Sequence, residues 1–152
     1  MSQQHRPQDD LARALGALVI DFAFLEEALH DAILITTGCP LGVVNVLTAG
    51  LQFRALVEKF GAVCADATEL RVPKADVGGF CRRLLALNEQ RNALVHSAWL
   101  VQRDTEPIRR VRRRADAVRG FTYAVTEVKP EQIDALAQEL LTVEAKLWEI
   151  VP

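Results

Sequence analysis

One stretch near the start of the chain constrains the fold more than any other. Between Asp9 and Thr37, apolar side chains recur at alternating steps of four and three residues, the spacing of one face of an α-helix. The members of this stripe are Leu11, Leu15, Leu18, Phe22, Leu25, Leu29 and Ala32. Because such a stripe has to be buried against other elements, a helix of about eight turns is predicted to lie on a hydrophobic core.

The rest of the chain shows the same helical spacing, except for one segment with the pattern of β-strands. Asp9 or Asp10 is expected to cap the first helix, and Gly38 with Pro40 to end it. Further helices are predicted over about 41–68, 76–100 and 130–150, and short β-strands over 99–101, 108–112 and 121–128. The predicted fold is mainly α: an antiparallel bundle of about four long helices, with a small β-hairpin or meander at about 99–128 before the last helix.

Length and composition agree with one globular domain. The chain has 152 residues, half of them apolar and a quarter charged, so we expect a single domain over 1–152 with a flexible tail at 1–8. Neither a secretory leader nor a run of about 18 apolar residues is present, and we expect a cytoplasmic protein with no membrane partner. Cys39, Cys64 and Cys81 are too few and too far apart for a disulfide framework, so they are interpreted as small core residues.

Charge is distributed very unevenly along the chain. The net charge is −2, yet residues 79–119 carry ten basic and four acidic side chains, whereas both flanking segments are acidic. Attraction to phosphate depends on charge within about a Debye length, so this basic segment permits a polyanionic partner although the whole chain is acidic. No phosphate-binding loop, dinucleotide fingerprint or set of metal ligands is found, and we expect no cofactor and no metal.

The segment 87–99 of the third predicted helix contains an unusual polar set. At about 100° per residue, Arg91 falls in the middle of the apolar arc, while Asn92, His96 and Glu89 fall together along its edge. A buried arginine cannot lose its proton, so it needs a carboxylate or must face an anion. In the first interpretation it pairs with Glu26 on the first helix. In the second, Arg91 and His96 form an anion and proton-transfer site suited to phosphodiester cleavage.

The run from Arg91 to His96 (RNALVH) resembles the R-x4-6-H motif of HEPN domains, including the polar residue directly after the arginine. This resemblance implies a dimeric helical bundle and, in many members, a metal-independent endoribonuclease of toxin–antitoxin or antiviral systems, with the motif paired across the dimer. It would make His96 the general acid or base for attack by the ribose 2′-hydroxyl, Arg91 the stabiliser of the phosphorane, and Asn92 a ligand of phosphate or of the imidazole. Glu26 and Glu89 would support these residues.

The resemblance also implies partners and permits an alternative. A homodimer, RNA and a cognate antitoxin protein are the partners expected. The superfamily also contains non-catalytic members, so the alternative is a dimeric helical module that binds RNA or an acidic protein. The tyrosine that often follows the histidine by two residues is replaced by Ala98, so the resemblance does not extend to control by tyrosine modification.

Arginines crowd the predicted β segment. They are interpreted either as a solvated strand edge or as an arm that tracks phosphates. The candidates for RNA binding are Arg109, Arg110, Arg112, Arg113 and Arg114. Along the chain no aromatic residue separates these arginines, and Phe121 and Tyr123 come only at the far end, so a base-stacking platform is not expected.

Overall fold

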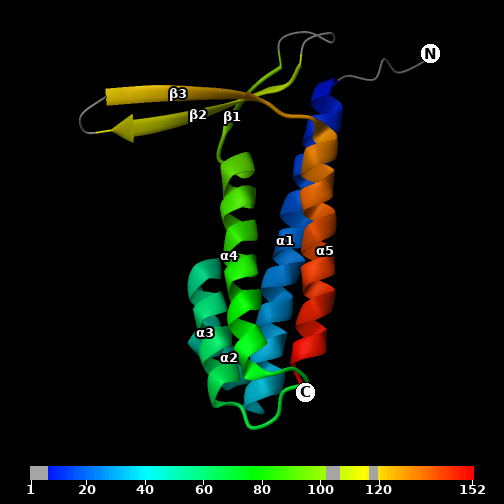
Figure 1. The fold of residues 1–152 in the computed structure, drawn as a ribbon, viewed down its shortest axis with the longest axis vertical. Helices are drawn as coiled ribbons and strands as arrows, with labels where there is room; N and C mark the ends of the chain where they lie inside the picture. Colours follow the sequence, from blue (N-terminus) through cyan, green and yellow to red (C-terminus); the bar gives the residue numbers. More distant parts are fainter. Residues whose placement is uncertain (1–6, 102–106, 117–119) are drawn as a thin grey trace, which may run out of the picture.

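The computed structural model describes residues 7–101, 107–116 and 120–152, and it confirms the predicted fold class (Figure 1). Helices and a small antiparallel sheet follow one another in the order that the sequence predicts. The elements are α1 (Pro7–Thr37), α2 (Leu41–Thr48), α3 (Phe53–Asp66), α4 (Lys74–Val95), β1 (Ala98–Leu100), β2 (Arg109–Asp116), β3 (Gly120–Glu127) and α5 (Pro130–Ile150).

The three long helices make up the body of the molecule. Helices α1 and α5 lie side by side and run in the same direction, and α4 runs in the opposite direction (Figure 1). An ion pair of 2.8 Å between Arg13 and Asp134 joins α1 and α5 near their N-terminal ends. At the other end, the backbone N–H of Arg71 donates to the carbonyl of Ile150 over 3.0 Å. The three-stranded sheet lies at the end of the bundle where α4 stops and α5 begins.

Both ends of α1 follow from local chemistry. Gly38 has a φ of +63°, a conformation open to glycine, and its N–H donates to the carbonyl of Leu34 over 3.0 Å, as expected for a helix end. The start differs from the prediction, because α1 already includes Pro7, whose fixed φ suits a first turn. Asp9 and Asp10 therefore lie inside the first turn and are not its caps. Residues 1–6 of the expected tail lie outside the described residues.

The single helix predicted over 41–68 is wrong, because two helices occupy this segment. Helices α2 and α3 are separated at Gly50, which has a φ of +71° and so cannot belong to a right-handed helix. The apolar spacing continues across the break, which is why the pattern alone predicted one helix. Helix α2 ends with the hydroxyl of Thr48 donating to the carbonyl of Val44 over 2.7 Å.

The helix predicted over 76–100 ends early. Helix α4 stops at Val95, His96 occupies its C-cap, and Ala98–Leu100 form strand β1. Pairing of Trp99 with Arg110 and of Leu100 with Arg109 gives this segment backbone partners in a sheet, which replace further helical turns. The helical pattern and the β pattern overlapped here, and strand pairing decided between them.

The sheet has the order β1-β2-β3 and is antiparallel throughout, as the predicted meander requires. Strand β1 pairs with only the first three residues of β2, so most of β2 and β3 forms a two-stranded ribbon that projects from the bundle (Figure 1). Arg113 pairs with Tyr123, and Ala115 with Phe121. The expectation that aromatic residues stay apart from the arginines is therefore wrong, because folding of the ribbon brings them together.

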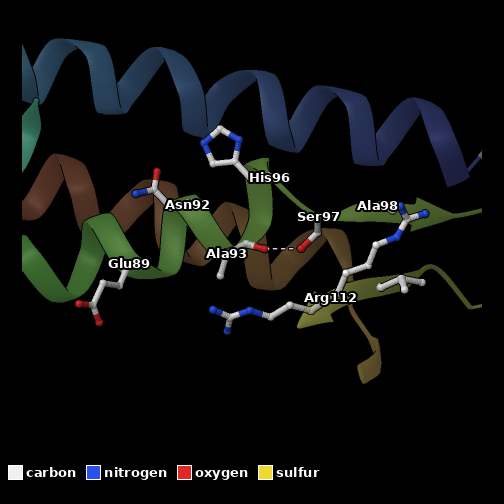
Figure 2. Close-up of a pocket in the computed structure, with 9 residues that line it drawn as sticks. Glu89, Asn92, Ala93, His96, Ser97, Ala98 and Arg112 are labelled. Atoms are coloured by element: carbon white, nitrogen blue, oxygen red, sulfur yellow. Dashed lines mark hydrogen bonds between the residues drawn. The ribbon is translucent and has the colours of Figure 1, made fainter. Parts of the chain in front are cut away.

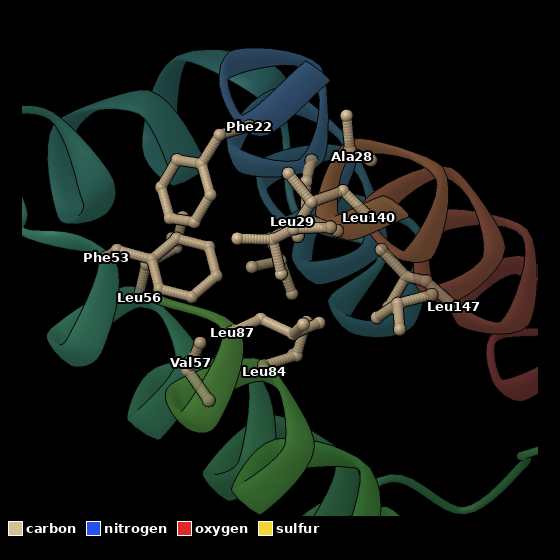
Figure 3. Close-up of a cluster of buried hydrophobic side chains, with 14 of the residues drawn as sticks. Phe22, Ala28, Leu29, Phe53, Leu56, Val57, Leu84, Leu87, Leu140 and Leu147 are labelled. Carbon is tan, nitrogen blue, oxygen red and sulfur yellow. The ribbon is translucent and has the colours of Figure 1, made fainter. Parts of the chain in front are cut away.

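The hydrophobic core is one continuous cluster along α1. Side chains from α1, α3, α4 and α5 meet in it, as Figure 3 shows, and the rings of Phe22 and Phe53 lie 4.5 Å apart between centroids. Cys64 is fully buried, and Cys39 and Cys81 pack at the edge of the core. All three are free thiols, as predicted. None of the helices within the described ranges combines the length and apolar character that crossing a lipid bilayer requires.

Two neighbouring leucines of α5 provide a test of this core. Leu140 is 0% exposed and Leu141 is 40% exposed. We expect Leu140→Ala to lower the free energy of unfolding by about 2–5 kcal/mol, because it leaves a cavity among packed side chains. The same substitution at Leu141 removes contacts that solvent replaces, and should cost less than about 1 kcal/mol. Urea denaturation measures both, and equal losses would contradict the packing described.

Candidate functional site

His96 stands at the mouth of an open cleft between the end of α4 and strand β2. Its backbone N–H donates to the carbonyl of Asn92 over 3.1 Å and closes the last turn of α4, while its side chain is exposed. The cleft has a volume of about 740 Å³, and Figure 2 shows Asn92 and His96 on the same side of α4. Its other walls come from Glu89, Ala93, Ser97, Ala98, Val111, Arg112 and Arg113. An exposed imidazole thus lines a cleft that Arg112 and Arg113 also line.

Arg91 is half-buried, as its place on the apolar arc predicts. Its guanidinium carbon lies 4.3 Å from the centre of the Phe22 ring, and Nη1 donates to Oδ1 of Asn92 over 2.8 Å. The amide of Asn92 in turn donates to Oδ1 of Asn88 over 3.2 Å. The buried Nε of Arg91 has no hydrogen-bond partner among the described residues. The guanidinium therefore packs on an aromatic ring while one of its N–H donors stays unused.

The predicted ion pair between Arg91 and Glu26 does not form within the described part of the chain. Both residues line a cavity of about 450 Å³ enclosed by α1, α3 and α4. The pKa of the Glu26 carboxyl is raised above its usual value, because burial outweighs the opposing influence of Arg91 and His30. The two charges interact across the cavity, but the contacts of Arg91 are with Phe22 and Asn92.

Arg91 and His96 do not share one pocket within a subunit. Arg91 lines the cavity beside α1 and α3, His96 lines the cleft beside β2, and Asn92 and Glu89 form the wall between the two. Glu89 makes an ion pair of 3.5 Å with Arg54 of α3. The predicted catalytic pair is thus brought to adjacent cavities, with Asn92 bridging them.

The arginine-rich segment contributes directly to these cavities. Arg112 and Arg113 line the His96 cleft, and Arg112 also lines a third cavity of about 590 Å³ between α4, the sheet and α5. Arg110 lies in that third cavity, where its buried Nε has no partner among the described residues. Arg109 is exposed, and the side chain of Arg114 lies outside the described part of the structure. The ribbon is therefore one wall of the candidate site.

Several lining residues could not be identified from the sequence. Phe22 and Arg54 approach Arg91 only because α1, α3 and α4 pack together, and Val111 approaches His96 only through the pairing of β1 with β2. The sequence likewise could not predict that the buried Nε atoms of Arg91 and Arg110 have no hydrogen-bond partner among the described residues. Among the described residues no group of three His, Cys, Asp or Glu side chains is placed to hold a metal ion.

Glu26→Gln tests whether the carboxylate stabilises Arg91. A raised pKa means that Glu26 holds its proton more tightly in the folded state than in the unfolded state. The proton on Glu26 therefore stabilises the folded state fully at about pH 4, and this stabilisation is lost as the pH rises. Glu26→Gln should therefore have a higher Tm than the wild type at about pH 7, with the difference vanishing at about pH 4. Thermal unfolding followed by circular dichroism measures this.

The exposed neighbour Glu27, changed to Gln, is the matched control and should leave the pH profile of the wild type intact. A lower Tm for Glu26→Gln at neutral pH would show instead that Arg91 depends on the carboxylate.

Comparison with protein-family models, with curated proteins and with solved structures gave no match. The resemblance of the segment from Arg91 to His96 to the HEPN motif therefore stays a prediction. A function for this site has to be argued from the residues and their geometry.

Proposed function

We propose that this chain is a HEPN-like dimeric endoribonuclease of toxin or defence type, which cleaves RNA without a metal ion. The observation that carries the proposal is the exposed His96, which lines an open cleft together with two arginines. The adjacent cavity, which shares Glu89 and Asn92 with this cleft, is lined by the half-buried Arg91, and Arg91 forms no ion pair with a described carboxylate. A proton-transfer group and an unneutralised cation are the two components that transesterification of RNA requires.

In the proposed reaction, His96 acts as general base and removes the proton from a ribose 2′-hydroxyl. The 2′-oxygen forms a bond to the adjacent phosphorus, the bond from phosphorus to the 5′-oxygen breaks, and that oxygen takes a proton from water. His96 then returns its proton to the solvent. The products are a 2′,3′-cyclic phosphate and a 5′-hydroxyl. Arg91 stabilises the charge on the phosphorane, and Asn92, already bonded to the guanidinium, orients it.

The dimer is part of the proposal, because Arg91 and His96 line separate cavities within one subunit. A second copy packed on α1 and α2, beside the Arg91 cavity, would allow arginine and histidine from both chains to enclose one phosphate. Support for self-association comes from large apolar side chains that α1 and α2 leave exposed in a single chain. They are Val19, Ile20, Phe24, Ile35, Leu41, Val43, Val46 and Leu47.

Cleavage of a mixed RNA pool in EDTA tests the activity. We expect the wild type to produce cyclic phosphate ends, and His96→Ala to reduce the rate at least about 100-fold, the usual contribution of an acid–base residue. Arg91→Lys keeps the charge but loses the planar guanidinium and its fixed donors, so it should also lower the rate while remaining folded. Denaturing gels and end-group analysis by mass spectrometry measure these effects.

A matched control comes from the same residue type elsewhere in the fold. Arg82→Ala changes an exposed arginine of α4 that lines none of these cavities, and it should cleave like the wild type. Activity that survives in His96→Ala would point to a contaminating nuclease. A folded wild type that cleaves no RNA would leave the non-catalytic binding module as the function.

Sedimentation velocity tests the dimer. We expect the wild type to sediment as a dimer, and Phe24→Glu combined with Val46→Glu to sediment as a folded monomer, because a charge placed in an apolar interface is not solvated there. Ala135→Glu, on an exposed position of α5, is the control and should remain dimeric. A monomeric wild type at micromolar concentration would contradict the composite site.

A further inference from the structure

The ribbon of β2 and β3 has two chemically different faces. Side chains alternate along a strand, and residues paired across an antiparallel ladder point to the same side. The pairs Val111–Val125, Arg113–Tyr123 and Ala115–Phe121 therefore share one face, which we call the aromatic face. The pairs Arg110–Thr126 and Arg112–Ala124 belong to the other face, and Thr122 points to that side too. Arg113 thus lies beside the ring of Tyr123 although the two residues are separate in the sequence.

No described element of the chain covers the aromatic face. Phe121 is 77% exposed, Tyr123 is 64% exposed and Val125 is 57% exposed. Burying these side chains would have been favourable, yet the ribbon projects from the bundle and leaves them in solvent (Figure 1). Two exposed rings, two positions apart on the same strand, are suited to a ligand with flat rings of its own.

The aromatic face is continuous with the His96 cleft. Val111 and Arg113 belong to that face and also line the cleft. Moving along the ribbon from its tip, Phe121 comes first, then Tyr123 beside Arg113, and then the cleft. A strand lying along this face would reach His96 at its end.

The charge of the ribbon selects the occupant. Residues 109–116 and 120–127 contain five arginines and two acidic residues, and the aromatic face itself carries Arg109 and Arg113 against Glu127, so both the ribbon and this face are net positive, which favours a polyanion. Packing of two copies through the same face would bring two positively charged ribbons together, and like charges repel. A single-stranded nucleic acid suits both the exposed rings and the positive charge, because its bases stack on aromatic rings and its phosphates pair with arginine.

We propose that the aromatic face is a stacking platform for single-stranded RNA, on which Phe121 and Tyr123 each take a base and Arg113 contacts the intervening phosphate. An RNA strand bound on this platform continues into the His96 cleft. The choice of RNA rests on the proposed function, whereas the stacking platform rests on the ribbon alone. A duplex is excluded as the preferred ligand, because its bases are already stacked on one another.

Binding is tested on full-length His96→Ala, so that cleavage does not interfere. The probe is a labelled single-stranded RNA of about ten nucleotides, within the range one such surface covers. We expect Phe121→Ala and Tyr123→Ala each to raise Kd about 5- to 100-fold in fluorescence anisotropy. Tyr123→Phe keeps the ring and should keep the affinity, and Thr122→Ala, on the opposite face, is the matched control.

An abasic strand of the same length and charge separates stacking from electrostatic attraction. We expect it to bind more weakly than RNA and to be insensitive to Tyr123→Ala. Equal affinity of the alanine variants and the parent protein for RNA would overturn the platform, as would stronger binding of duplex RNA. A loss of the dimer in Tyr123→Ala, seen by sedimentation without any change in RNA affinity, would assign the face to a second copy of the chain.

The two proposals fail in different ways. Binding that depends on Phe121 and Tyr123, in a wild-type protein that cleaves nothing, would overturn the nuclease and leave the platform. Cleavage that needs His96 but is unchanged by Phe121→Ala and Tyr123→Ala, together with unchanged affinity, would overturn the platform and leave the nuclease.

Discussion

The rest of the structure depends on the apolar stripe of α1 that faces the core. Helices α2, α3, α4 and α5 all pack on this helix, and the core that they share runs along it. Where α3 and α4 meet α1, Phe22 faces Arg91, and Glu26 lines the same cavity. The candidate site is therefore a consequence of how α3 and α4 meet α1, and its position is fixed by hydrophobic packing rather than by ion pairs.

Arg91 shows what this packing does to a charge. A guanidinium is weakly hydrated and stacks on aromatic rings, so it tolerates the place over Phe22 better than an ammonium group would. Its contact with Asn92 satisfies one donor, while the buried Nε remains unpaired at a cost of about 1–3 kcal/mol. Arg110, which lines a cavity beside α4, has a second buried Nε without a hydrogen-bond partner among the described residues. Unpaired buried donors of this kind are uncommon in folded proteins, and either a water molecule or an anion in the cavity would satisfy them.

Local patterns predicted the helices with strong periodicity and failed where two signals competed. The extents of α1 and α5 follow from apolar spacing and from Gly38 and Pro130, which act within a few residues. Gly50 divided a segment whose spacing continued across it, and the pairing of Trp99 with Arg110 ended α4 five residues before the helical pattern did. The half-burial of Arg91 could be predicted from its place on the helix. Its partner could not, because the choice between Glu26, Phe22 and Asn92 depends on distances between helices.

The ribbon shows most clearly why the order of residues along the chain is an incomplete guide to a binding surface. In the sequence, Arg113 and Tyr123 are ten positions apart, and the aromatic residues follow the arginines as a separate group. A hairpin reverses the second group onto the first, so alternation within each strand and pairing between strands place a ring beside a guanidinium. Five of the ten basic residues of the segment 79–119 lie on this projecting ribbon. A chain with a net charge of −2 thereby presents a cationic, aromatic surface next to an accessible histidine, and local charge rather than net charge decides what that surface binds.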